Sequence, residues 1–163
     1  MEEIRVNRLP AITWQYLHVN DSPDQFEFPG SSASAVFSDK RYVSEGGTLP
    51  ADFCGASAET LAAAEKGQAY TVIIPENTEA ELTISITAEE DRPDFAGCFT
   101  FKLEKGAKLK LIWRLSGDRK HSVFATASFY ELMKNAALSV SYLETGLPAS
   151  SLYEPVSYTH LTL

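Results

Sequence analysis

Cysteine is scarce in this sequence of 163 residues, which contains only Cys54 and Cys98. Two cysteines so far apart form neither a disulfide framework nor a CxxC metal or redox motif, so a reducing compartment is predicted. Basic residues are also few: 14 Lys and Arg oppose 22 Asp and Glu, giving a net charge of −8. This excess of negative charge excludes a general electrostatic binder of nucleic acid or anionic membranes.

Long apolar runs are missing as well, and none approaches the roughly 18–20 residues of a membrane span. The start, Met1-Glu2-Glu3-Ile4-Arg5, lacks the basic and apolar regions of a secretion signal. The sequence contains no Gly-rich phosphate loop, GxSxG elbow or HExxH motif. With 44% hydrophobic residues, it predicts one soluble, cytoplasmic globular unit with a sizeable core.

From Tyr70 onward, apolar and polar residues alternate in the pattern of half-buried strands. In the clearest run, 107–115, the inner face is predicted to carry Ala107, Leu109, Leu111, Trp113 and Leu115. The other face of that run carries Lys108, Lys110 and Arg114. Further strands are predicted at 70–74, 82–86, 98–103, 123–129 and 138–142. Their inner faces are expected to hold Leu82, Ile84, Ile86, Phe99, Phe101, Leu103, Val123, Ala125, Ala127, Phe129, Leu138, Val140 and Tyr142.

The segments between these strands are short and polar, such as Glu104-Lys105-Gly106. None has the length and period of a crossover helix, which disfavours a doubly wound α/β sheet and predicts an all-β fold. Periodicity does not separate an antiparallel sandwich from a parallel β-helix, whose successive turns are called rungs here. The lack of Asn-Gly and Asp-Gly hairpin pairs favours a coil of rungs slightly.

The first part of the chain has a different character. Residues 21–56 are rich in Ser, Gly, Pro and Asp and predict irregular surface chain. Two short helices are predicted, one over 14–17 capped by Thr13 and one over 58–66 capped by Ser57, with Gly67 as its stop signal. The chain is thus divided into an irregular N-terminal region (1–69), β-rungs (70–146) and a tail (147–163).

Three segments carry a resemblance to a known family. They are 7–20 (NRLPAITWQYLHVN), 70–77 (YTVIIPEN) and 103–112 (LEKGAKLKLI). The first resembles the N-terminal signature of SufD-like proteins of the SufB/SufD iron–sulfur cluster assembly family, and the others are similar to its first core strands. The resemblance covers about residues 5–146. It implies a right-handed parallel β-helix, begun here and preceded by a mostly irregular region with one or two short helices.

The resemblance also implies a function. The chain is expected to be a fragment of a non-catalytic scaffold that pairs, when full length, with SufB-like and SufC-like partners. The complex, rather than this fragment, would handle the iron–sulfur cluster transiently. The family's parts that face SufB, bind SufC and carry a reactive His match no residue here. From Pro155 on, the sequence departs from the family and is interpreted as a non-native end.

Candidate ligands of an iron–sulfur protein are thiolates and imidazoles. Cys54 and Cys98 lie on different segments and are interpreted as structural. Cys54 is expected to pack in a loop, whereas Cys98 alternates with Phe99 and is expected to be an outward or rung-edge thiol. His18 is expected to pack or cap locally, His121 to be solvated, and His160 belongs to the tail. No catalytic, cofactor-binding or metal-binding residue is therefore predicted.

Two charged groups remain. The acidic segment Glu89-Glu90-Asp91-Arg92-Pro93-Asp94 is interpreted as a solvated turn. Lys102, Lys108, Lys110 and Arg114 are interpreted as an ordinary solvent-exposed face. The carboxylates leave open an alternative function, a carbohydrate-active or carbohydrate-binding β-helix or β-sandwich protein. The last strand lacks a following rung, so self-association through it is expected.

Overall fold

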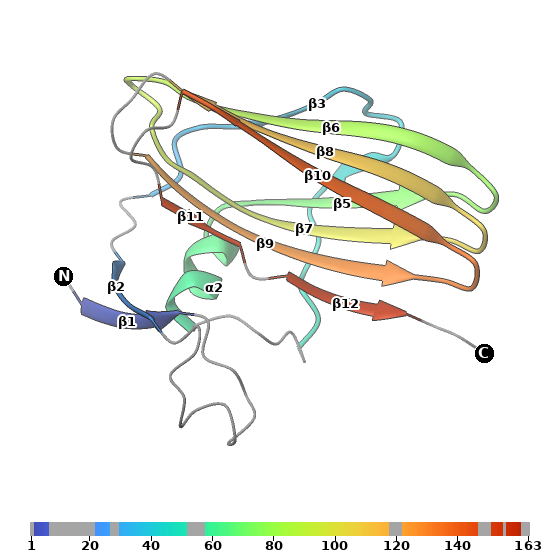
Figure 1. Cartoon of the computed structure of the whole chain (residues 1–163), viewed down its shortest axis with the longest axis horizontal. Helices are drawn as coiled ribbons and strands as arrows, with labels where there is room; N and C mark the ends of the chain where they lie inside the picture. Colours follow the sequence, from blue (N-terminus) through green and yellow to red (C-terminus); the bar gives the residue numbers. More distant parts are fainter. Residues whose placement is uncertain are drawn as a thin grey trace.

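The computed structural model describes residues 2–6, 22–26, 30–51, 58–117, 122–146, 151–154 and 156–160 (Figure 1). The first elements of this part are β1 (Glu2–Val6), β2 (Ser22–Phe26), β3 (Ala35–Phe37), β4 (Val43–Glu45) and helix α2 (Ala58–Glu65). The long strands follow as β5 (Gln68–Ile74), β6 (Glu79–Ala88), β7 (Phe95–Leu103), β8 (Lys108–Gly117), β9 (Val123–Leu132) and β10 (Ala137–Thr145). Two short strands, β11 (Ser151–Tyr153) and β12 (Val156–His160), come last.

From β5 to β10 the chain alternates between two facing sheets (Figure 1), while β1 and β2 pair with each other in a small separate sheet. Strands β6, β8 and β10 pair in parallel in one sheet, and β5, β7 and β9 pair in parallel in the other. Strand β7 therefore pairs with β5 and β9 and not with its neighbour in sequence, β8. The prediction of stacked parallel rungs is confirmed, and the interleaved pairing is a β-helix-like stack.

Successive rungs are offset by 29 residues, as the Glu79–Lys108 and Glu81–Lys110 contacts between neighbouring strands show. The turns joining the two sheets repeat at the same interval. Asn77, Gly106 and Asn135 occupy equivalent turn positions with φ of 55°, 70° and 61°. This left-handed conformation suits Gly and Asn, and at Gly106 an added Cβ would collide with the side chain of Asn77. The turns thus keep every rung in register.

The core lies between the two sheets. As predicted, the inner row of β8 is buried, with Trp113 packed edge-on against Phe99 at 4.8 Å between ring centroids. Tyr70 stacks on Phe99 at 5.5 Å, and Phe101 stacks on Tyr130 at 4.8 Å. Equivalent side chains of successive rungs therefore form columns, and the burial of these large rings is the main stabilising contribution of the fold.

Strand β9 differs from the prediction. Val123, Ala125, Ala127 and Phe129 were expected to face the core, but the core-facing row is the other one, with Phe124, Tyr130 and Leu132. The prediction was wrong because both faces of β9 are buried over much of its length. Ala125 and Ala127 lie on the outer face, beneath α2.

The predicted second helix is confirmed as α2, although it ends at Glu65 and not at Lys66. It covers the outer face of β7 and β9 (Figure 1), where Ala63 packs with Ala96 and Ala125. Because the side chains in contact are alanines on both the helix and the sheet, the helix approaches the sheet closely. Gly67 follows, and a Cβ at this position would collide with the backbone carbonyl of Ala96. Close packing, rather than a left-handed stop, explains this glycine.

The segment 21–56 also differs from the predicted irregular chain. It contains β2, β3 and β4, of which β3 pairs antiparallel with β6 and β4 pairs antiparallel with β5. Strands of three residues are too short to show a period, and they form here because the first rung offers unpaired backbone groups. The predicted helix over 14–17 lies outside the described residues. So does the segment 7–20, which carried the family resemblance.

In the tail, β11 and β12 both pair in parallel with β9. They occupy the place of the next rung on that sheet (Figure 1). Within the described ranges, no helix is long and apolar enough to cross a membrane.

Candidate functional site

Cys98 lies on the outer face of β7, as predicted, but helix α2 covers it there. It is 7% exposed and packs with Ala64 and Ala127 beneath α2. Burial, with a smaller effect of Glu65, raises the pKa of its thiol to about 11. The burial of Cys98 was not predicted, because the period of β7 does not reveal that a helix covers its outer face. A thiol with so high a pKa is a poor nucleophile and metal ligand at neutral pH.

The other candidate ligands are not brought to one place in the described part. Cys54, His18 and His121 lie outside the described residues, and His160 ends β12 without a described side chain. Among the side chains that the structure describes, no group of three or more His, Cys, Asp or Glu could hold a metal ion.

The acidic segment after β6 forms a turn in which the backbones of Glu89 and Arg92 bond to each other at 3.0 and 3.1 Å. Their side chains form an exposed ion pair. Asp94 is buried instead, and its Oδ1 accepts a hydrogen bond from the backbone N–H of Val123 at 2.9 Å. The Asp94 side chain thus ties one rung to the next. Its backbone carbonyl also accepts hydrogen bonds from the backbone N–H groups of Ser32 and Ala33.

The basic face is balanced by acidic neighbours. Lys108 pairs with Glu79, Lys110 pairs with Glu81 at 2.9 Å, and Lys102 pairs with Glu131 at 3.8 Å. The hydrogen bond from Lys108 lowers the pKa of Glu79. Such exposed ion pairs contribute little to stability. Because acidic side chains lie beside these lysines on the neighbouring strands, the described residues form no basic stripe for an anionic partner.

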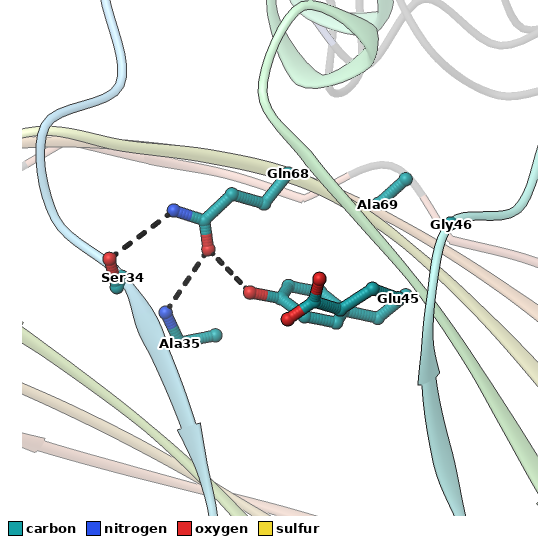
Figure 2. A pocket seen from close by; sticks show the side chains of 7 residues that line it. Ser34, Ala35, Glu45, Gly46, Gln68 and Ala69 are labelled. Carbon is teal, nitrogen blue, oxygen red and sulfur yellow. Dashed lines mark hydrogen bonds between the residues drawn. The ribbon is translucent and has the colours of Figure 1, made fainter.

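A cleft of about 550 Å³ opens between the starts of β3 and β5 and the end of β4 (Figure 2). The Gln68 amide lies at its centre. Its Nε2 donates to the Ala33 carbonyl at 3.1 Å and to Ser34 Oγ at 3.4 Å. Its Oε1 accepts from the Ala35 N–H at 3.4 Å and from the Tyr70 hydroxyl at 2.6 Å. Both donors and both lone pairs of the amide are thus used within the chain.

The Tyr70 ring that borders this cleft is enclosed by other rings. Phe37 packs edge-on against it at 4.8 Å, and Phe99 stacks on it at 5.5 Å. Burial and the nearby Glu45 carboxylate raise the pKa of Tyr70. A sugar-binding site needs an open aromatic face, so this cleft does not support the carbohydrate alternative. Gln68 and Tyr70 instead hold β3 on the first rung.

At the opposite end of the stack, one of the two sheets has an open edge within the described residues. Strand β10 is the edge of its sheet and pairs with β8 on one side only, while the described chain places no strand on the other side. Three apolar side chains of β10 are unusually exposed: Val140 at 37%, Tyr142 at 40% and Leu143 at 51%. The predicted exposure of the apolar face is confirmed for Val140 and Tyr142, whereas Leu138 is half-buried against the core and Leu143 lies on the other face of the strand.

Strand β10 carries one charged residue, Glu144 near its end, and its first seven residues are uncharged. Edge strands usually carry charged residues, Lys above all, which prevent pairing with other chains. The outer rows of the preceding strands carry Glu79 and Glu81 on β6 and Lys108 and Lys110 on β8. At the equivalent positions β10 has Ala137 and Ser139. The open end is therefore a nine-residue strand with free backbone groups and an exposed apolar row.

Comparison with known proteins does not identify the chain. No family model, no curated protein and no solved structure matches it. The open end of the stack, formed around β10, is accordingly the candidate functional site on the strength of its own geometry.

Proposed function

We propose that this chain is a non-catalytic scaffold subunit of the SUF iron–sulfur cluster assembly machinery. Its two sheets belong to a right-handed parallel β-helix, and its open end docks on a SufB-like subunit. A SufC-like ATPase completes the assembly, and the iron–sulfur cluster is cargo of the complex. Support comes from the resemblance of 7–20, 70–77 and 103–112 to SufD-like proteins and from the parallel, 29-residue repeat of the rungs.

The observation that carries the proposal is the state of β10. A scaffold subunit acts by presenting a surface to partners, and an edge strand whose first seven residues are uncharged is a surface for strand addition. The opposite end of the stack is closed, because β3 and β4 pair with the first strand of each sheet. Docking is therefore directed to one end.

Co-purification tests this proposal. A tagged full chain, produced anaerobically with SufB-like and SufC-like subunits, is expected to retain both. Val140→Lys places a charge on the inner row of the edge strand and is expected to lose the SufB-like subunit. Val36→Lys is the matched control, because Val36 is 61% exposed on β3 at the opposite edge of the same sheet.

Retention of the partner by Val140→Lys, or its equal loss from both variants, would contradict docking at the open end. Failure of the unmodified chain to retain either partner would contradict the scaffold function itself. A further expectation concerns the isolated chain: anaerobic reconstitution with iron and sulfide leaves it without a visible charge-transfer band. A stoichiometric band that disappears in Cys98→Ser would show that the chain holds a cluster of its own.

A further inference from the structure

The two sheets of the stack differ in what lies on their outer faces. Helix α2 lies against β7 and β9 of one sheet (Figure 1). The outer rows of β6, β8 and β10 in the other sheet are exposed or half-buried along their whole length. Within the described residues, the stack therefore has one outer face covered by a helix and one outer face open to solvent.

The charges of the open face are paired near the start of β8 and unpaired near its end. Lys110 forms an ion pair with Glu81 of the neighbouring strand at 2.9 Å. Arg114 lies further along the same outer row, with Ser85 of β6 on one side and Leu143 of β10 on the other. It is exposed, and in the described part of the chain its guanidinium has no ion pair or hydrogen bond. Its five N–H donors are thus free to bind an external acceptor.

Apolar side chains flank this arginine. Val36, Ser85, Arg114 and Leu143 form one row across β3, β6, β8 and β10, because each is the register partner of the next. Val36 is 61% exposed and Leu143 is 51% exposed, the two highest values among the large hydrophobic side chains of the described residues. The row therefore combines an unpaired cation with apolar surface, and arginine beside apolar surface is typical of protein interfaces.

We propose that this row, named here the Arg114 row, docks an amphipathic helix of a partner protein that carries a carboxylate between apolar side chains. A carboxylate complements the guanidinium, since two parallel N–H groups reach its two oxygens at once. A helix satisfies its own backbone groups, whereas a strand laid on the face of a sheet would leave its backbone unpaired. The partner differs from the strand proposed to add to β10, because that strand would extend this face and would not cover it.

The spacing of the row defines the helix that fits it. Neighbouring strands are about 4.8 Å apart, so Arg114 lies about 10 Å and Leu143 about 14 Å from Val36 across the sheet. A helix rises about 1.5 Å per residue, so positions i, i+7 and i+11 share one face at about 0, 10.5 and 16.5 Å. The matching helix has apolar residues at i and i+11, an acidic residue at i+7 and a small residue at i+4, above Ser85.

Peptide binding to the full chain tests the proposal. The probe is a fluorescently labelled helical peptide with Leu at i and i+11, Ala at i+4 and Glu at i+7, and its matched control has Gln at i+7. Fluorescence anisotropy is expected to show saturable binding that is at least about fivefold tighter for the Glu peptide. The net charge of −8 disfavours the Glu peptide, so general electrostatic attraction does not produce this preference.

Two variants locate the preference on the chain. Arg114→Gln is expected to bind both peptides equally, because the guanidinium is gone. Lys110→Gln is the matched control and is expected to keep the preference, since Lys110 lies on the same outer row but is already paired with Glu81. Both variants replace exposed side chains, and their melting temperatures are expected to equal that of the unmodified chain.

Equal affinity of the unmodified chain for the Glu and Gln peptides, or no saturable binding of either, would overturn the proposal. So would loss of the preference in Lys110→Gln as well as in Arg114→Gln. Binding to phosphatidylglycerol vesicles that depends on Arg114, without a preference between the peptides, would assign the face to a membrane instead. None of these results bears on docking through β10, which the Val140→Lys experiment decides separately.

Discussion

One column of side chains tests whether the end of the stack is open in solution. Leu82, Leu111 and Val140 occupy the same position in three successive rungs. Leu82 and Leu111 are fully buried, whereas Val140 is 37% exposed. Truncation to alanine should therefore be severe at the first two positions and mild at the third.

The magnitudes follow from burial. Leu→Ala in a packed core costs about 2–5 kcal/mol, since a cavity adds to the lost transfer free energy. Val140→Ala removes two carbon groups worth about 0.8 kcal/mol each when buried, so its roughly two-thirds burial predicts a cost of about 1 kcal/mol. A difference of at least about 1 kcal/mol between Leu111→Ala and Val140→Ala is thus expected.

Urea denaturation at several protein concentrations measures both free energies of unfolding. The concentration series also detects self-association through β10, which would bury Val140 and make the midpoint depend on concentration. If Val140→Ala costs as much as Leu111→Ala in a chain that sediments as a monomer, β10 is covered within that chain. The open-end interpretation would then be refuted.

Three other predictions concern single groups. Cys98, with its thiol pKa raised to about 11 beneath α2, is expected to react with a disulfide reagent much more slowly in the native than in the urea-unfolded chain, and equal rates would show that α2 does not cover it. Glu154 has its pKa raised above the ordinary 4.5, so the folded state binds this proton more tightly and its contribution to stability increases as pH falls through the raised pKa. Urea titrations at several pH values should show that increase in the unmodified chain and not in Glu154→Gln. Asn135, at φ 61°, should tolerate glycine, whereas Asn135→Val should cost about 1–2 kcal/mol by thermal melting, and a neutral valine would contradict the left-handed turn.

The sequence alone predicted the features that depend on neighbouring residues. The run 107–115 alternates strictly because one face of β8 lies on the core and the other in water, and this is the condition under which a period of two is visible. Helix α2 was predicted because its alanines and flanking residues act locally.

Tertiary structure decided what depends on residues that are distant along the chain. Parallel pairing joins residues 29 apart, and strand periodicity is the same in a hairpin and in a coil. The inward row of β9 and the burial of Cys98 depend on α2 covering the outer face, which no local pattern of β7 or β9 records. The hydrogen bonds of Glu154 with Ser128 and Tyr142 likewise exist only because stacking brings these distant residues together, and the sequence around each of them is that of an ordinary strand or loop.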